Sequence, residues 1–259
     1  MQTHTIAIAN EKGGVGKTVT VINLAAALNR LNRKVLVVDM DPQANATKGL
    51  GVSVEAGQPN IYGLLSDPDA ADAHQAIVST AWEGLDVIPS HTDLSGAEVE
   101  LTNEHGRENR LKEALADLPD AYDVVLIDTP PSLSLLTVNV FTYARFVLVP
   151  CQTHPYAYGA LQALFDTIGA VKDAINPDIT VLGILATFYD HRTRVARSIL
   201  DRLKNEAAYR DLLFKTVIRT NTAIAESADK GRPVVFYRRS SFGAIDYTQF
   251  AEEMMARLD

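Results

Sequence analysis

The glycine-rich stretch Lys12–Thr18, KGGVGKT, restricts the fold more than any other part of this sequence. It follows the apolar run Thr5–Ala9, which predicts a strand, and it leads into Thr18–Leu31, whose apolar periodicity predicts a helix. The three glycines let the backbone N–H groups of the turn point toward one centre and approach phosphate oxygens closely. A strand, a turn of this kind and a helix in this order are typical of a P-loop, so an α/β fold is expected.

Positions within this loop have expected contacts with a triphosphate. Lys17 would reach the β- and γ-phosphates, the hydroxyl of Thr18 would reach Mg²⁺, and the helix N-terminus near Lys17 would favour the negative charge. The general pattern G-x-x-x-x-G-K-[ST] has a glycine where this chain has Glu11. A purely structural glycine turn is the alternative, but Gly-Lys-Thr in register between a strand and a helix favours the phosphate site. The loop residues expected to contact the nucleotide are Gly13, Gly14, Val15, Gly16, Lys17 and Thr18.

Apolar runs alternate with amphipathic stretches along the chain, which predicts repeated strand–helix–strand units. Most runs are continuous in Val, Ile and Leu, as is typical of parallel strands that are covered on both faces. We therefore expect a doubly wound, mostly parallel sheet with helices on both faces. The expected strands are Thr5–Ala9, Lys34–Asp39, Leu85–Pro89, Asp123–Asp128, Phe146–Pro150, Val181–Phe188, Lys215–Ile218 and Val234–Tyr237. The expected helices are Thr18–Leu31, Leu94–Leu118, Leu133–Ala144, Gly159–Ile175, Arg194–Glu206 and Phe242–Leu258.

The stretch Gly49–Ala81 departs from this alternation. Its clusters of Gly, Pro and Asp predict loops, with one short helix around Ile61–Leu65. The sequence contains no internal repeat and no recognisable linker. Residues 1–259 are therefore expected to form a single domain.

Composition and the cysteine count narrow the class of protein. A chain of 259 residues that is 47% apolar can bury a full core, and its longest apolar runs are too short to cross a bilayer. The N-terminal sequence MQTHTIAIANEKGG is typical of a first strand rather than of a signal peptide. Cys151 is the single cysteine, so no internal disulfide can form, and the cytoplasm is the expected location.

Charge is unevenly distributed over a chain whose formal net charge is −8. Residues 1–150 hold 10 Lys and Arg against 19 Asp and Glu, a net −9, whereas residues 151–259 hold 14 against 13, a net +1. Within residues 186–240 the numbers are 12 against 6, a net +6. A basic sector of this kind can bind phosphate backbones locally, although a solvated face of mixed charge explains the numbers equally well.

Carboxylates stand at the ends of two expected strands. The run KVLVVD ends at Asp39, with Asp41 close behind it, and the run DVVLID ends at Asp128. Because ligands bind at the carboxyl ends of parallel strands in open α/β sheets, these acids should lie near the P-loop. Four apolar residues followed by Asp are typical of a Walker B strand, in which Asp128 would hold Mg²⁺ through water. An aspartate at a strand end can also act only as a helix cap or turn former.

Taken together, these motifs resemble the ParA/Soj branch of the deviant Walker A ATPases, a group that also includes MinD and the nitrogenase iron protein. The resemblance is carried by KGGVGKT, VVDMDPQANAT and LIDTPPS and by the C-terminal stretch GRPVVFYRRSSFGAIDYTQFAEEM, and it covers nearly the whole chain. It implies an ATP hydrolase that uses ATP and Mg²⁺ and forms a homodimer when ATP is bound.

The resemblance gives catalytic roles to Lys12, Lys17 and Asp41. Lys12 would cross the interface of the ATP-bound dimer and touch the phosphates held by the other subunit, where a second cation offsets charge that develops in phosphoryl transfer. A solvent-exposed loop lysine is the alternative. Asp41 would orient the attacking water or respond to the γ-phosphate as part of switch I, and Asp128–Ser132 would form switch II.

The same resemblance implies the metal and base contacts. Thr18 and Asp128 would hold Mg²⁺, and Asp39 would support the metal from a distance. Asn221 would lie near the adenine. Val19 stands where the family has a second Thr whose hydroxyl reaches the α-phosphate; its backbone N–H can still bind there, with a loss of about one hydrogen bond, ~1 kcal/mol.

A second departure from the family pattern lies in the segment QTHPYAYGALQ. The family has Q-x-E-x-x-A-L-E-G there, whereas this chain has His154, Pro155 and Tyr156. A histidine at this position suggests either a pH effect or a hydrogen-bonded loop histidine.

The family also implies DNA binding without sequence preference, through arginines of the C-terminal half. Arg192 stands where the family has an arginine that contacts DNA, whereas Ala223 occupies the other favoured position. Neutralising phosphates depends more on the number of charges than on their exact positions, so Arg238 and Arg239 are alternative sources of charge. The residues expected to contact DNA are Arg192, Arg194, Arg197 and Arg219.

The implied function is plasmid or chromosome partition on the nucleoid, with ATP hydrolysis stimulated by a ParB-like partner. A relative that positions another cargo, such as a carboxysome or a chemoreceptor cluster, would use the same chemistry. A MinD-like membrane switch is disfavoured because the acidic end TQFAEEMMARLD is unlike a basic amphipathic membrane helix, so no membrane partner is expected. An enzyme of the iron-protein type is disfavoured because its cluster requires several cysteines.

Overall fold

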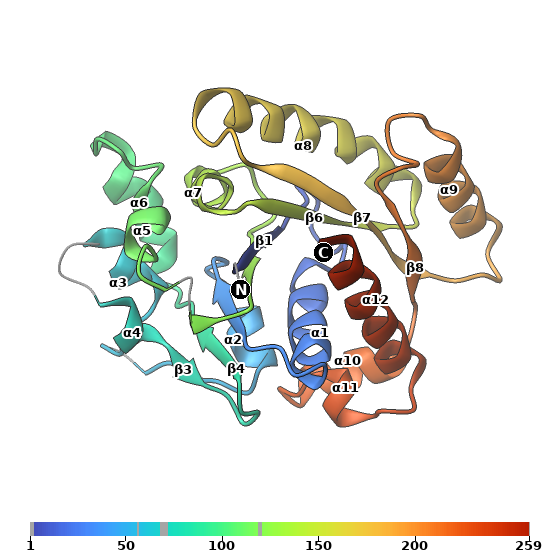
Figure 1. Ribbon diagram of the computed structural model, residues 1–259, viewed down its shortest axis with the longest axis horizontal. Helices are drawn as coiled ribbons and strands as arrows, with labels where there is room; N and C mark the ends of the chain where they lie inside the picture. The colour runs from blue at the N-terminus through green and yellow to red at the C-terminus, as the bar shows by residue number, and fades with distance from the viewer. Residues whose placement is uncertain (1–2, 56, 68–71, 119–120, 259) are drawn as a thin grey trace.

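The computed structural model describes residues 3–55, 57–67, 72–118 and 121–258, and in this part of the chain eight strands form one sheet (Figure 1). The strand order is β3-β4-β2-β5-β1-β6-β7-β8, and every neighbouring pair is parallel except β3 with β4. The strands are β1 (His4–Ile8), β2 (Val35–Asp39), β3 (Val78–Ser79), β4 (Leu85–Ile88), β5 (Val124–Asp128), β6 (Phe146–Gln152), β7 (Thr180–Tyr189) and β8 (Leu213–Arg219).

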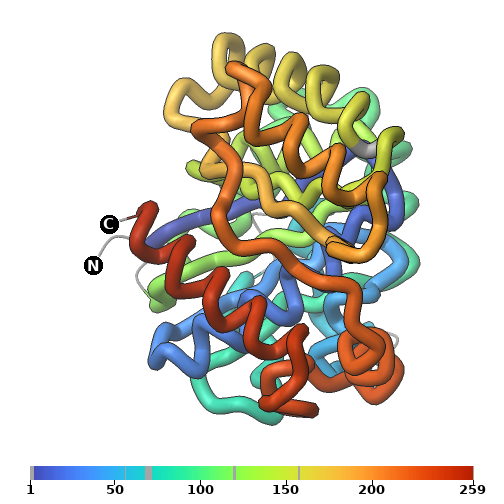
Figure 2. The backbone as a smooth tube through the Cα atoms, turned by 90° about the vertical axis from the view of Figure 1, so that its right-hand side faces the viewer, coloured from blue at the N-terminus to red at the C-terminus, as the bar shows by residue number. Residues whose placement is uncertain are grey.

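Helices cover both faces of this sheet, which confirms the predicted doubly wound architecture. Seen from the side, α8 and α9 lie above the strands, while α1 and α12 lie below them (Figure 2). Of the described helices, none has both the length and the apolar character that crossing a bilayer requires. The helices are α1 (Lys17–Arg30), α2 (Asn45–Gly49), α3 (Ile61–Ser66), α4 (Ala73–Ala76), α5 (Leu94–Glu100), the 3₁₀ turn η1 (Leu101–Asn103), α6 (Arg110–Ala114), α7 (Leu135–Tyr143), α8 (Pro155–Ala174), α9 (Arg194–Asn205), α10 (Thr222–Asp229), α11 (Val234–Tyr237) and α12 (Phe242–Leu258).

The central strand β1 shows why the strands are apolar without interruption. Ile6 and Ile8 pack into the layer formed with α1 and α12, while Ala7 packs into the opposite layer with α7 and α8. Both faces are therefore buried, and burying each isoleucine contributes on the order of 1.5–3 kcal/mol. The small Ala7 leaves room for helices on the second face.

Register places the ends of the central strands together. Asp39 at the end of β2 lies opposite Asp128 at the end of β5, and Asp128 lies opposite Ile8 at the end of β1. Since these strands are parallel, the loops that follow them leave from one edge of the sheet, next to the start of α1. The site is built at this edge.

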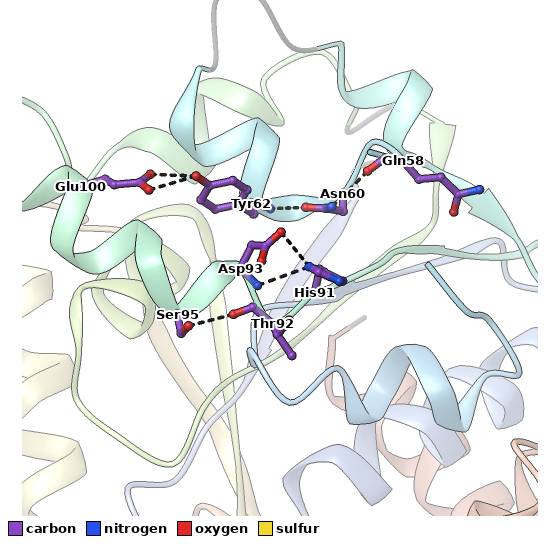
Figure 3. Close-up of polar contacts among 8 residues, drawn as sticks. All are labelled: Gln58, Asn60, Tyr62, His91, Thr92, Asp93, Ser95 and Glu100. Atoms are coloured by element: carbon purple, nitrogen blue, oxygen red, sulfur yellow. Dashed lines mark hydrogen bonds and ion pairs between the residues drawn. The ribbon is translucent and has the colours of Figure 1, made fainter. Parts of the chain in front are cut away.

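The region around α3 is held by polar contacts (Figure 3). The Asn60 side chain accepts a hydrogen bond from the backbone N–H of Tyr62 and caps α3, and the Tyr62 hydroxyl donates to Glu100 on α5 at 3.0 Å. The Nδ1 of His91 lies 3.0 Å from a carboxylate oxygen of Asp93 just before α5. The short helix predicted around Ile61–Leu65 is thus confirmed, while the predicted loops include residues 68–71, which lie outside the described residues.

Two other expectations need correction. The helix predicted over Leu94–Leu118 is interrupted, because a polar turn with Gly106 at φ 70° separates η1 from α6. The strand predicted over Val234–Tyr237 is the helical turn α11: Pro233 precedes it, and the Asn23 side chain accepts the N–H of Val234. Helices α2, α4 and α10 and strand β3 were not predicted; α4 and β3 lie in the stretch predicted as loops, and Asn221 followed by helix-forming residues is a start signal for α10.

Candidate nucleotide site

The turn between β1 and α1 forms an open cradle of backbone amides. Gly14 has φ 75° and Gly16 has φ 91°, left-handed conformations that glycine adopts without steric cost. Gly13 and Gly14 are exposed, and Gly16 directly precedes the first residue of α1. The free N–H groups and the dipole at this helix N-terminus favour an anion in the cradle.

Lys17 places a cation in this cradle. The residue is 7% exposed, and its Nζ donates hydrogen bonds to the carbonyl oxygens of Asn10 at 2.9 Å and Lys12 at 3.2 Å. Burial lowers the pKa of Lys17, while the carboxylates of Asp128 and Asp41 raise it. An ammonium group held in this way can exchange loop carbonyls for phosphate oxygens with little movement.

Asp128 provides a buried carboxylate without a protein partner. It is 0% exposed, and among the described residues neither carboxylate oxygen has a hydrogen-bond partner of standard geometry. Burial and the nearby Asp39 raise the pKa of Asp128, while the Thr18 hydroxyl lowers it. An orphaned carboxylate beside a hydroxyl and a phosphate cradle fits Mg²⁺, which takes one or two protein ligands and completes its shell with phosphate and water.

The donor set agrees with that kind of metal site. Within the described ranges, no group of three or more His, Cys, Asp or Glu residues is arranged to hold a metal ion. A dedicated protein cage is therefore absent from this part of the chain, and the residues present suit a metal that arrives with a nucleotide.

Asp39 is held by hydrogen bonds to the segment that follows β2, and its expected support of the metal stays a prediction. Its oxygens accept hydrogen bonds from the N–H of Asp41 at 3.2 Å, the N–H of Thr47 at 2.8 Å and the hydroxyl of Thr47 at 2.7 Å. Burial raises the pKa of Asp39 to about 6, and the Thr47 hydroxyl lowers it. Asp39 therefore anchors the segment that carries Asp41, and Asp41 itself is 8% exposed and lines the cavity above the P-loop.

Two adjoining cavities open beside the P-loop. One has a volume of about 350 Å³ and is lined by the glycines, Lys17, Thr18 and Asp41. The other has a volume of about 310 Å³ and is mainly apolar; its lining includes Asn221 and Tyr247. Together they match a ligand with a charged end and a flat apolar end. Gly16, Val19 and Phe188 line both cavities.

Asn221 lines the apolar cavity, and its expected place near the adenine stays a prediction. Its side-chain oxygen accepts the N–H of Ala223 at 3.0 Å and caps α10, so its amide nitrogen is the group left for a ligand. Tyr247 lies beneath this cavity, fully buried, with its hydroxyl 3.3 Å from that of Thr20. Sequence reasoning missed Tyr247, because only the packing of α12 on α1 brings it to the site.

Lys12 is turned toward its own chain. Its Nζ lies 5.5 Å from the ring centroid of Tyr156, an exposed residue in the first turn of α8. The ring of His154 lies 5.5 Å from the same Tyr156 ring. A cation–π contact at an exposed site is worth roughly 0.5–1 kcal/mol, so Lys12 can leave it readily.

The predicted DNA-binding arginines are separated into two environments. Arg194 and Arg197 are exposed in the first turn of α9, and Arg192 is exposed in the turn just before it, where it donates two hydrogen bonds to Asp190 at 2.9 Å. Arg219 instead donates to the buried Asp246, at 2.5 Å from Nη2, and its guanidinium lies 4.1 Å from the Phe242 ring centroid. Of the alternatives, Arg238 and Arg239 are both exposed.

Replacing Asp246 should therefore affect stability. In an Asp246→Asn protein the Arg219 guanidinium and backbone N–H lose a charged acceptor, and the free energy of unfolding should fall by about 1.5–3 kcal/mol. Urea unfolding measures this change. The matched Asp190→Asn protein removes the exposed pair with Arg192 and should unfold at the wild-type midpoint; equal midpoints for both variants would contradict a structural role for Arg219.

A family model, curated relatives and solved structures resemble this chain. A family model described as an AAA domain matches residues 3–181. The sporulation initiation inhibitor protein Soj of Bacillus subtilis is 41% identical over 251 residues, 97% of this chain and 98% of its own length. The chromosome-partitioning ATPase Soj of Thermus thermophilus is 44% identical over 254 residues, 98% of this chain and 96% of its own. A crystal structure of cobyrinic acid a,c-diamide synthase from Mycobacterium smegmatis, with an ATP analogue and magnesium bound, has a TM-score of 0.84 and 36% identity and covers 99% of this chain and 96% of that one.

Proposed function

Because the chain belongs to the ParA/Soj family of partitioning P-loop ATPases, we propose that it hydrolyses ATP and, when loaded with ATP, forms a homodimer that binds DNA without sequence preference. The observation that supports this most is the buried Lys17 ammonium set between the glycine cradle and the orphaned Asp128 carboxylate. Such a site suits a nucleotide triphosphate with its metal.

ATP and Mg²⁺ are the proposed cofactors. When bound, Mg²⁺ would neutralise negative charge on the phosphates of the nucleotide. Among the chain's own residues, Thr18 and Asp128 would hold the metal, Lys17 would bind the phosphates, and Asp41 would orient the attacking water. Asp39 would keep the Asp41 segment in place through Thr47.

The dimer would be held by Lys12. In the monomer this lysine lies over Tyr156 rather than in its own cradle, so its charge is available for the phosphates of a second copy. A cation supplied in trans makes dimerisation depend on the nucleotide and offsets charge in the transition state.

DNA would be bound by the exposed arginines at the start of α9. An Arg192→Glu protein should bind duplexes of any sequence more weakly, and the slope of log K against log salt should become shallower by about 1. Fluorescence anisotropy at several salt concentrations measures both the affinity for DNA and the slope of its salt dependence. Arg30→Glu, which reverses an exposed charge at the far end of α1, is the matched control. Unchanged affinity in the Arg192 variant would exclude this surface.

Partition of a plasmid or chromosome on the nucleoid, in the cytoplasm and without a membrane partner, is the proposed role. A ParB-like protein would stimulate hydrolysis and release the dimer from DNA. DNA binding measured with ATP, with ADP and without nucleotide tests the role, since nucleoid-based transport requires binding with ATP alone. Positioning of another cargo would give the same result. Identifying the partner protein distinguishes that role from the partition of a plasmid or chromosome.

An amide-forming synthase is a second candidate, because the M. smegmatis structure carries that name. Transfer of an amide nitrogen by covalent catalysis would need a reactive thiolate. Cys151, the single cysteine, is 0% exposed, and burial raises its pKa to about 12. The chain therefore has no thiol suited to that step, and the partition ATPase is preferred.

A further inference from the structure

Phe188 has an unusual backbone conformation for a bulky residue. Its φ is 51°, in the left-handed region, although it lies within β7. Aromatic side chains rarely adopt this region because it is sterically unfavourable. The pairing of β7 with β8 changes register between Ala186 and Tyr189, so Phe188 lies in a β-bulge. Bulges re-aim side chains beside binding sites.

Contacts on both sides enforce this conformation. The Thr187 hydroxyl donates to the carbonyl of Val15 in the P-loop at 2.8 Å. Just after the end of β6, the N–H of Thr153 donates to the carbonyl of Thr187 at 3.1 Å, and its hydroxyl donates to the carbonyl of Phe188 at 3.3 Å. Strained residues persist where their surroundings over-determine them, and such positions cluster at ligand sites.

The bulge brings the Phe188 ring against the P-loop backbone. A Cβ placed on Gly16 would lie 3.2 Å from Cε2 of the ring. Phe188 lines both cavities with Gly16 and Val19, so these residues form their junction. A ligand with phosphates in one cavity and a base in the other must cross this junction. Phe188 is 37% exposed there and would bury apolar surface against such a ligand.

We propose that the Phe188 ring packs against the nucleoside half of the bound nucleotide, where the ribose meets the base, and thereby positions the triphosphate over the P-loop. This inference rests on the proposed function, because it places a nucleotide across both cavities. The phosphates themselves are left to Lys17 and the loop amides. The strained backbone is retained because it aims the ring at the sugar and base.

Two ligands separate this role from a general effect on the loop. Isothermal titration calorimetry of the whole chain would compare Mg²⁺–ATP with Mg²⁺–tripolyphosphate, which has no nucleoside. Phe188→Ala and Phe188→Gly should each weaken ATP binding about tenfold and leave tripolyphosphate binding within about twofold of wild type. Phe188→Tyr keeps the ring and should keep wild-type affinity for both ligands.

Thermal unfolding without nucleotide tests the strain separately. Glycine adopts φ 51° without steric cost, so Phe188→Gly should unfold at a temperature on the order of 2–4 °C above Phe188→Ala. Asn32→Gly is the matched control: Asn32 also has a positive φ, 59°, but lies between α1 and β2 at the other end of the sheet. The Asn32→Gly protein should bind ATP with wild-type affinity.

Two results would overturn the inference while leaving the proposed function intact. One is wild-type ATP affinity in Phe188→Ala and Phe188→Gly. The other is an equal loss of ATP and tripolyphosphate affinity, which would assign the ring to the shape of the loop. Failure of the wild-type chain to bind ATP would refute the proposed function itself.

Discussion

A Lys17→Ala protein is expected to bind ATP at least about 100-fold more weakly than the wild type, a loss of roughly 3 kcal/mol. Lys17 is the buried cation of the cradle, and its Nζ already lies among loop carbonyls where phosphate oxygens would bind. Alanine leaves the triphosphate facing the Asp128 and Asp41 carboxylates without that ammonium group. Calorimetric titration with Mg²⁺–ATP measures the change.

The matched control for this loss is Lys34→Ala. Lys34 is an exposed lysine just before β2, at the opposite edge of the sheet, and its removal should leave ATP affinity unchanged. Thermal unfolding without nucleotide shows whether the Lys17 variant is folded. A folded Lys17→Ala protein with wild-type ATP affinity would place the triphosphate elsewhere.

A Lys12→Ala protein is expected to keep ATP binding within a few-fold of wild type but to lose ATP-dependent dimerisation, with the dimer dissociation constant raised about 100-fold or more. The reason is the placement of Lys12: it lies over Tyr156 in its own chain and only its backbone carbonyl contacts Lys17. Removing its charge therefore takes little from the cradle of its own subunit. Calorimetry measures the nucleotide affinity, and sedimentation velocity measures the dimer.

Lys48→Ala controls for loss of any positive charge near the site. Lys48 is exposed on α2, and its Nζ donates to the carbonyl of Gln43 in the segment that carries Asp41. This variant should dimerise with ATP as the wild type does. Normal dimerisation of Lys12→Ala would refute the role in trans, whereas loss of ATP binding would place Lys12 in its own cradle.

The positions of the P-loop residues could be predicted because a strand, a glycine turn and a helix follow one another directly in the sequence. Gly14 and Gly16 are needed for a turn whose conformation other residues resist, and Lys17 follows directly at the start of α1. Asp39 and Asp128 end strands, and parallel register alone brings them together. The roles of these residues, and the single-domain organisation, stay predictions.

Other features of the fold and the site depend on contacts between segments that are distant in the sequence. The run Val234–Tyr237 has strand-forming residues, yet Pro233 and the Asn23 side chain make it a helical turn. Arg219 counts as a free cation in the sequence, but packing pairs it with Asp246. The position of Phe188 beside the P-loop could not be predicted from the sequence. It depends on a bulge in β7 that contacts with Val15 and Thr153 hold in place. Charge counts and periodicity carry no information about such pairings.

Whether the γ-phosphate joins two copies of this chain is tested most directly by sedimentation velocity with Mg²⁺ and a non-hydrolysable ATP analogue, beside the same protein with Mg²⁺–ADP. A dimer with the analogue and a monomer with ADP are expected. A monomer with both nucleotides, at protein concentrations well above those needed to saturate the site, would contradict dimerisation driven by ATP.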